Sequence, residues 1–170
     1  MGDDKNLLNE VASGSYDASE RPFDFVEADA KTALTCETDG PTREKIGQAL
    51  KEMGYQITEA VAARDALKRM RFHVYDVVVV NENFEGAGQG NGVLVYLENL
   101  SMHTRRNIFV VLISDTYRTM DNMAAFNRSV NLVINQKNIA DLGTIIKGGI
   151  ADNAAFYHVF KETLKKMGRI

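Results

Sequence analysis

The stretch Asp76-Val77-Val78-Val79-Val80-Asn81, followed by glycines at positions 86, 88, 90 and 92, decides how this chain folds. Four consecutive valines without polar alternation are typical of a strand that is covered on both faces. A polar residue and a glycine-rich loop then follow directly. We therefore predict a central strand of a parallel sheet, whose carboxyl end opens into a long loop.

On both sides of this strand, short apolar runs alternate with amphipathic segments. We predict strands over 33–36, 55–58, 76–80, 108–113 and 132–134, and helices over 41–53, 62–70, 93–100 and 120–127. A last helical segment begins at Ile139, is interrupted at Gly148 and Gly149, and carries one apolar stripe of Phe156, Val159, Phe160, Leu164 and Met167. Strand followed by helix, five times over, predicts an α/β fold with a doubly wound (βα)5 sheet in three layers.

The N-terminal residues differ in composition from the rest of the chain. Residues 1–31 have few apolar side chains among many Gly, Ser, Asp and Glu, so they cannot bury enough surface to offset the entropy of ordering. We expect a disordered or loosely docked arm over 1–31 and one domain over 32–170. The exception is the segment 21–26, whose two phenylalanines and valine could dock on the domain or add an edge strand.

Composition excludes several classes of function. With 20 basic and 23 acidic residues the formal charge is -3, which offers no general attraction to nucleic acid or to an anionic membrane. No apolar run reaches the length that crosses a bilayer. The single cysteine, Cys36, cannot form an intramolecular disulfide and fits a buried strand thiol in a reducing compartment. We expect a cytoplasmic protein that binds neither nucleic acid nor membrane.

Polar residues follow the predicted strands at the points where the strands end. In parallel sheets with helices on both faces, the functional crevice lies outside these carboxyl ends. The residues there are Glu37, Thr38 and Asp39 after the first strand, Asn81 after the third, Ser114 and Asp115 after the fourth, and Asn135 after the fifth.

In this order of elements and strand ends, residues 32–170 resemble the receiver domains of bacterial response regulators, which have a flavodoxin-like fold. The segments 39–46 and 76–81 carry most of the resemblance. An active receiver has two acids after strand one, a phosphoryl-accepting Asp at the end of strand three, Ser or Thr after strand four and Lys after strand five. The resemblance places Glu37 and Thr38, Asn81, Ser114 and Asn135 at these positions.

Three of the required groups are absent from those positions. The neutral amide of Asn81 cannot form the acyl phosphate that a carboxylate forms. Mg²⁺ needs several oxygen ligands, usually carboxylates, and only Glu37 remains of the acid pair. Asn135 lacks the positive charge that would hold a phosphoryl group. The resemblance therefore implies a pseudo-receiver of two-component signal transduction, with no catalytic residues, no metal and no cofactor, that acts through protein contacts.

Two alternatives for the crevice stay open. The carboxylates of Glu37, Asp39, Glu82 and Asp115 could rebuild a divalent-cation site, which would make the domain a sensor or an atypical phosphorylatable receiver. The backbone amides of the loop 86–92 could bind an anionic small ligand, although its glycine spacing misses the dinucleotide fingerprint and a flexible loop accounts for it as well.

Two further features bear on signalling and metal binding. Receivers often place an aromatic residue on strand five that reports the state of the strand-four hydroxyl, and here that position holds Leu132. His73, His103 and His158 are scattered without the spacing of metal ligands.

The working surface is expected where receivers commonly bind partners, on helix four, strand five and the final helix. We predict that it includes Arg118, Met120, Met123, Phe126, Tyr157 and Lys161, and that it binds an unidentified protein or a second copy of the chain. The opposing interpretation is that Met120, Met123 and Ala124 form one helical stripe that faces the sheet. Exposure of Phe126 distinguishes the two interpretations.

Overall fold

The computed structural model describes residue 9 and residues 30–85 and 90–169. Five parallel strands form one sheet in the order β2-β1-β3-β4-β5. Its strands are β1 (Thr32–Cys36), β2 (Gln56–Glu59), β3 (Val77–Asn81), β4 (Phe109–Ser114) and β5 (Leu132–Asn135). The predicted doubly wound α/β fold is confirmed, with each strand within two residues of its predicted bounds. The predicted arm lies almost wholly outside the described residues.

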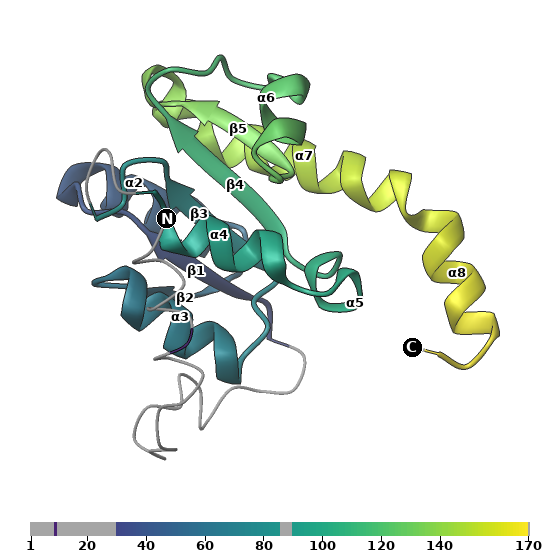
Figure 1. Ribbon diagram of the computed structural model, residues 1–170. Coiled ribbons are helices and arrows are strands. Elements are labelled where there is room, and N and C mark those ends of the chain that lie inside the picture. Colours follow the sequence, from purple (N-terminus) through teal and green to yellow (C-terminus); the bar gives the residue numbers. More distant parts are fainter. Residues whose placement is uncertain (1–8, 10–29, 86–89, 170) are drawn as a thin grey trace.

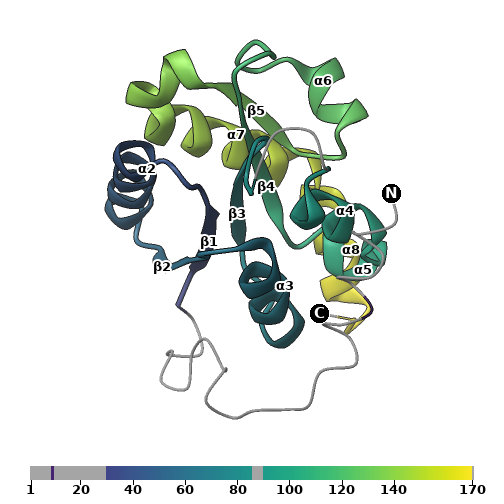
Figure 2. The ribbon, with the colours of Figure 1, turned by 60° about the vertical axis from the view of Figure 1, so that its left-hand side comes forward.

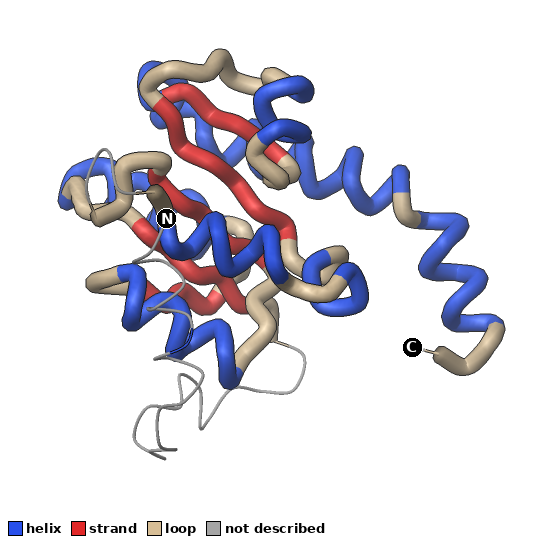
Figure 3. Tube along the Cα trace, viewed as in Figure 1, coloured by secondary structure: helices blue, strands red, loops and turns tan. Residues whose placement is uncertain are grey.

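Helices cover both faces of the sheet, as Figures 2 and 3 show. The chain runs through α2 (Gly40–Glu52), α3 (Ala63–Phe72), α4 (Gly92–Asn99), α5 (Met102–Arg105), α6 (Asn122–Asn127), η2 (Gln136–Asp141), α7 (Leu142–Phe156) and α8 (His158–Lys166). Residues of α2 and α7 pack on one face of the sheet, and residues of α3, α4 and α6 on the other.

The valine run explains why β3 lies in the centre of the sheet. Val78 and Val80 belong to the core on the α3 side, while Val77 and Val79 belong to the core on the α2 side. Successive side chains of a strand point to opposite faces, so an unbroken apolar run suits a strand that is buried twice. β3 pairs with β1 and β4, which brings the strand ends near Glu37 and Ser114 to its own end at Asn81.

The C-terminal helix differs from the prediction. The interruption predicted at Gly148 and Gly149 is wrong, because α7 continues through both glycines to Phe156. A Cβ atom on Gly149 would lie 3.1 Å from side-chain carbons of both Leu132 and Phe109. Gly149 thus permits the helix to pack closely on the sheet, and this packing outweighs the weak helix propensity of glycine.

The last helix, α8, has no buried side chain along its length, and Figure 1 shows it lying beyond the edge of the sheet. The predicted apolar stripe is largely exposed: Phe156, Val159 and Met167 are exposed, Phe160 is 40% exposed, and Leu164 is half-buried. Among the described helices, none combines the length and apolar character that crossing a bilayer requires.

The two glycines of α7 offer a matched test of this packing. Around Gly148 nothing lies within 4 Å of an added Cβ, so we expect Gly148→Ala to raise the free energy of unfolding by roughly 0.5–1 kcal/mol through helix propensity. Gly149→Ala should give no such gain, because the crowding against Leu132 and Phe109 offsets it. Urea unfolding of both variants measures the difference, and equal gains would contradict the close approach.

Candidate functional site

The crevice at the carboxyl ends of the strands is organised around a buried acid. Glu37, directly after β1, is only 2% exposed. Its Oε1 accepts a hydrogen bond from the backbone amide of Asp39 at 2.9 Å, and its Oε2 accepts one from Asn81 Nδ2 at 2.7 Å. A buried carboxylate is costly unless donors compensate it, and these two contacts supply that compensation.

Asn81 is fixed from three directions at the end of β3. Besides donating to Glu37, its Oδ1 accepts from the backbone amide of Asn83 at 2.8 Å, and its backbone carbonyl accepts from Asn91 Nδ2 at 2.9 Å. A carboxylate can only accept hydrogen bonds, so the amide nitrogen of Asn81 must be the atom that faces Glu37. The side chain thus presents a donor to a buried acid, at the position where the resemblance to receivers leads us to expect an acid.

Ser114 and Asn135 organise the loop that follows β4. The hydroxyl oxygen of Ser114 accepts hydrogen bonds from the backbone amides of Thr116 and Tyr117, both at 3.0 Å, in the turn that follows β4. Asn135 Nδ2 donates to the carbonyl of Tyr117 at 2.7 Å, and Asn135 Oδ1 accepts from the amide of Lys137 at 3.0 Å. Both side chains therefore form hydrogen bonds with the backbone of the loops that follow β4 and β5.

The other acids near the crevice also have local partners. Glu82 Oε1 accepts from the backbone amide of Asp115 at 2.7 Å, and Asp115 Oδ2 accepts from Asn83 Nδ2 at 3.4 Å. Asp39 caps α2, where its Oδ2 accepts from the amide of Thr42 at 2.9 Å. Hydrogen bonds from the Thr42 side chain and amide hold the pKa of Asp39 below its ordinary value.

These acids bear on the cation site that the sequence left open. Within residues 30–85 and 90–169, no three His, Cys, Asp or Glu side chains gather in a way that could hold a metal ion. The partner of the buried carboxylate of Glu37 is an amide of the chain itself. In the glycine-rich loop, positions 86–89 lie outside the described residues, while Gly92 begins α4 and Asn91 caps that helix.

Cys36, His73 and Leu132, which the sequence analysis also named, pack against neighbouring parts of the domain. Cys36 is fully buried, and this burial raises the pKa of its thiol, so the group is a core side chain. His73 Nε2 lies 2.8 Å from Thr32 Oγ1, and its ring packs edge-on against Tyr75. Burial lowers the pKa of His73 against an opposing effect of Asp76. Leu132 is buried and packs against Gly149.

The residues predicted for a working surface fall in two places. Arg118, Met120, Met123 and Phe126 belong to the segment from β4 through α6 and are exposed, with Phe126 at 79% and Met123 at 69%. The opposing interpretation, that the methionines face the sheet, is wrong: Met120 precedes the helix with a positive φ of 61°, and Ala124 and Ala125 supply the buried side of α6.

Tyr157 and Lys161 do not lie on α6. Tyr157 separates α7 from α8 and is half-buried, and Lys161 lines a cavity with Arg106 and Phe109 near the beginning of β4. The single surface predicted from the sequence is therefore divided between the β4–α6 segment and the C-terminal helices.

Two residues that hold the crevice together were missed from the sequence. Asn91 caps α4 and donates to the carbonyl of Asn81, and an Asn directly before an apolar helical run was the available signal for a cap. Gln136 Nε2 donates to Thr42 Oγ1 at 2.7 Å and joins the end of β5 to the first turn of α2. Thr42 and Gln136 are 94 positions apart in the sequence, and no local sequence pattern could reveal a contact between them.

Structure comparison identifies this architecture. A LuxR-family DNA-binding response regulator from Staphylococcus aureus matches 70% of this chain and 98% of its own with a TM-score of 0.54 and 19% identity. A CheY-like receiver domain from Methanospirillum hungatei matches 74% of this chain and 97% of its own with a TM-score of 0.56 and 18% identity. A response regulator from Chloroflexus aurantiacus gives a TM-score of 0.57 at 15% identity, over 71% of this chain and 98% of its own. The fold of this chain is the receiver fold.

Sequence comparison adds no closer relationship. No family model matches the chain, and no curated protein matches it.

The contact between Asn81 and Glu37 can be tested by replacing the amide with a carboxyl. We expect Asn81→Asp to lower the free energy of unfolding at pH 7 by about 1–3 kcal/mol, because it places a second acid against a buried one. Two neighbouring carboxylates repel each other when both are ionised, so the deficit is largest at high pH and shrinks as the pH falls and one of them takes up a proton. Urea titrations between pH 5 and pH 8 measure it.

Asn127→Asp is the matched control, because Asn127 is exposed at the end of α6. Equal, pH-independent losses in both variants would contradict the proposed contact.

Proposed function

We propose that this chain is a non-catalytic signalling or scaffold module, a receiver-fold domain that acts through protein contacts and not through phosphoryl transfer. The observation that carries the proposal is the 2.7 Å hydrogen bond from Asn81 Nδ2 to the buried Glu37 Oε2. A receiver in this fold needs a carboxylate nucleophile at the end of β3, and a neutral amide engaged with an acid cannot attack phosphorus and hold an acyl phosphate.

Electrostatics in the crevice also support the proposal. A phosphoryl group adds roughly 1.5 to 2 negative charges. Beside a buried carboxylate, these charges must be balanced by cations because like charges repel. The lysine position after β5 holds Asn135, whose amide nitrogen donates to the carbonyl of Tyr117. The acid position next to Glu37 holds Thr38. The crevice thus keeps its negative charge at Glu37 and has lost the groups that would offset more.

The residues that couple the phosphorylation site to the surface in receivers are also replaced or engaged in other contacts. Receivers often couple the strand-four hydroxyl to an aromatic residue on strand five, and here Ser114 accepts hydrogen bonds from two backbone amides of the following turn. The reporter position on β5 holds Leu132, a buried aliphatic side chain that packs against Gly149. Signalling by this domain therefore relies on a surface that is permanently formed.

The exposed apolar side chains of α6 and its entry loop supply such a surface. Met120, Met123 and Phe126 are exposed, while Ala124 and Ala125 anchor the helix to the core. An exposed aromatic fits an apolar pocket of a partner, and methionines adapt their shape to one. The partner is a protein with an apolar cleft or a second copy of the chain.

We expect that the domain accepts no phosphoryl group. Incubation with acetyl phosphate and Mg²⁺ should leave its intact mass unchanged, because Asn81 supplies no nucleophile. Asn81→Asp should also stay unmodified, since Thr38 and Asn135 still lack the acid and the lysine. A mass gain of one phosphoryl group in the original chain would refute the proposal. The same gain in the variant alone would show that the surrounding acids suffice to hold Mg²⁺.

We expect Phe126→Ala to weaken partner binding or self-association by about 5- to 30-fold, the loss typical of an interface anchor. The melting temperature should hardly change, because Phe126 is 79% exposed. Sedimentation and thermal unfolding measure the two quantities. Val61→Ala is the matched control, because Val61 is 84% exposed just before α3. A large loss of stability with unchanged association would place the working surface elsewhere.

A further inference from the structure

Two adjoining cavities open at the edge of the sheet opposite the crevice, where the strands begin. The first has a volume of about 330 Å³ and lies between α7 and the segment that joins α2 to β2. The second has a volume of about 210 Å³ and reaches from there toward α5 and α8. Both are lined by Lys31, Tyr55 and Ile150, so they form one continuous depression, which we call the basal groove.

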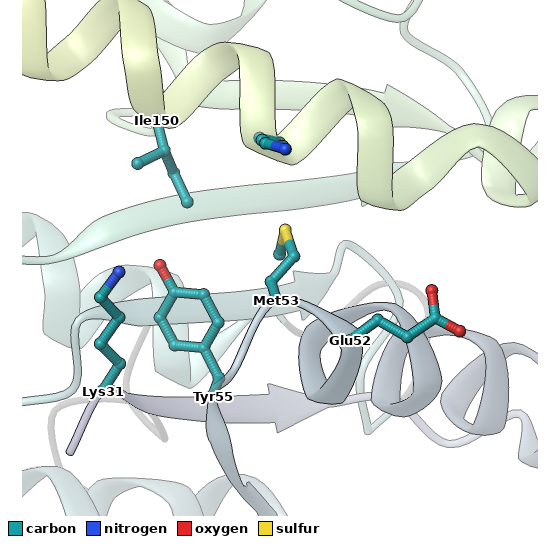
Figure 4. Close-up of a pocket in the computed structure, with 6 residues that line it drawn as sticks. Lys31, Glu52, Met53, Tyr55 and Ile150 are labelled. Atoms are coloured by element: carbon teal, nitrogen blue, oxygen red, sulfur yellow. The ribbon is translucent and has the colours of Figure 1, made fainter.

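The floor of the basal groove is apolar. Figure 4 shows Met53 and Tyr55 pointing toward α7, and Ile150 pointing from α7 toward them. All three side chains are half-buried and pack against the core on the α2 side of the sheet. Burial, with a smaller effect of Asp76, raises the pKa of Tyr55, as expected of a phenol partly withdrawn from water. A flat apolar group could rest on this floor without disturbing the fold.

Cationic side chains stand at both ends of the floor. Lys147 lines the first cavity, Arg106 and Lys161 line the second, and Lys31 borders both, with its Nζ 5.9 Å from the centre of the Tyr55 ring. Arg106 is held in place, because its guanidinium lies 4.9 Å from the ring centre of Phe160 and its Nη2 lies 3.1 Å from His103 Nδ1.

Two acids also line the groove, and each has a local partner. Glu52 accepts from Gln48 Nε2 at 3.1 Å, and Asp76 accepts from the backbone amide of Thr32 at 2.7 Å. The lining of the groove thus contains four cationic side chains and two acids, and both acids already accept hydrogen bonds. The electrostatic balance of the rim favours an anion.

We infer that the basal groove binds an elongated small molecule with a flat apolar body and an anionic group at each end. The body lies over Tyr55 and Ile150, which both cavities share. One anionic group meets Lys147 and the other meets Arg106 and Lys161, so both ends of the ligand are paired. The cavity volumes suit a compact ligand of about a dozen to twenty heavy atoms.

This ligand class explains the lining better than two simpler occupants. A small inorganic anion would pair with one cationic end but leave Met53 and Ile150 uncovered. A neutral apolar molecule would cover the floor but gain nothing from the cations at either end. Since the groove lies at the beginning of the strands, a ligand there would be separate from the crevice at their carboxyl ends.

Naphthalene-2,6-dicarboxylate is a suitable probe, because it has a flat apolar body and one carboxylate at each end. We expect the full chain to bind it with a dissociation constant on the order of 0.1–1 mM, a modest affinity for an open groove. Naphthalene-2-carboxylate should bind more weakly and the dimethyl diester more weakly still. Ligand-observed NMR and calorimetry at low and high salt measure all three.

Variants at the two ends separate specific binding from general attraction. Lys147→Ala and Arg106→Ala should each weaken binding of the dicarboxylate by roughly two- to fivefold, the effect of losing one exposed ion pair. Lys147→Ala should leave binding of the diester unchanged. Lys166→Ala, on α8 outside the lining of the groove, is the matched control and should change nothing.

Three outcomes would overturn the inference. The dicarboxylate could fail to bind, the diester could bind as tightly as the dicarboxylate, or Lys166→Ala could weaken binding as much as Lys147→Ala. Because these variants leave Asn81, Glu37 and α6 intact, such a failure would not bear on the proposed signalling role.

Discussion

The buried carboxylate of Glu37 is the constraint on which the organisation of the crevice depends. At 2% exposure it needs donors, and Asn81 at the end of the neighbouring strand supplies one of them. Asn81 in turn holds the turn after β3 through Asn83 and, through Asn91, the first turn of α4. The hydrogen bonds that begin at this one acid thus position the end of β3, the turn that follows it and the first turn of α4. The side-chain amide of Asn81 supplies the buried acid with a donor from within the chain.

Much of the fold could be predicted from local pattern alone. The valine run of β3 and the apolar run of β4 indicated central strands, because only strands buried on both faces lack polar alternation. Pro41 indicated the start of α2, and Gly54 its end. These signals are local and concern backbone preferences, so they transfer directly to the structure.

The errors came from contacts between distant segments. Glycines 148 and 149 suggested a break in a helix, but close packing of Gly149 on β5 and β4 keeps α7 continuous. The strand ends could be named from the sequence, whereas their pairing could not. No pattern indicates that Glu37 would accept from Asn81 or that Gln136 would reach Thr42. The basal groove was missed for the same reason, since its walls come from segments that are far apart in the sequence, between Lys31 and Lys161.

The exposed stripe of α8 has a consequence for the dynamics of the chain. A helix of nine residues is marginal in water by itself, and α8 has no buried side chain, although its Phe160 contacts Arg106 at the surface. We therefore expect its backbone amides to exchange with solvent by local fraying, without unfolding of the sheet. Any molecule that covers Val159 of α8, together with Phe156 before the helix and Met167 after it, also supplies packing that α8 lacks. Binding of a partner at this end of the molecule and formation of helix α8 are for this reason thermodynamically coupled: each favours the other.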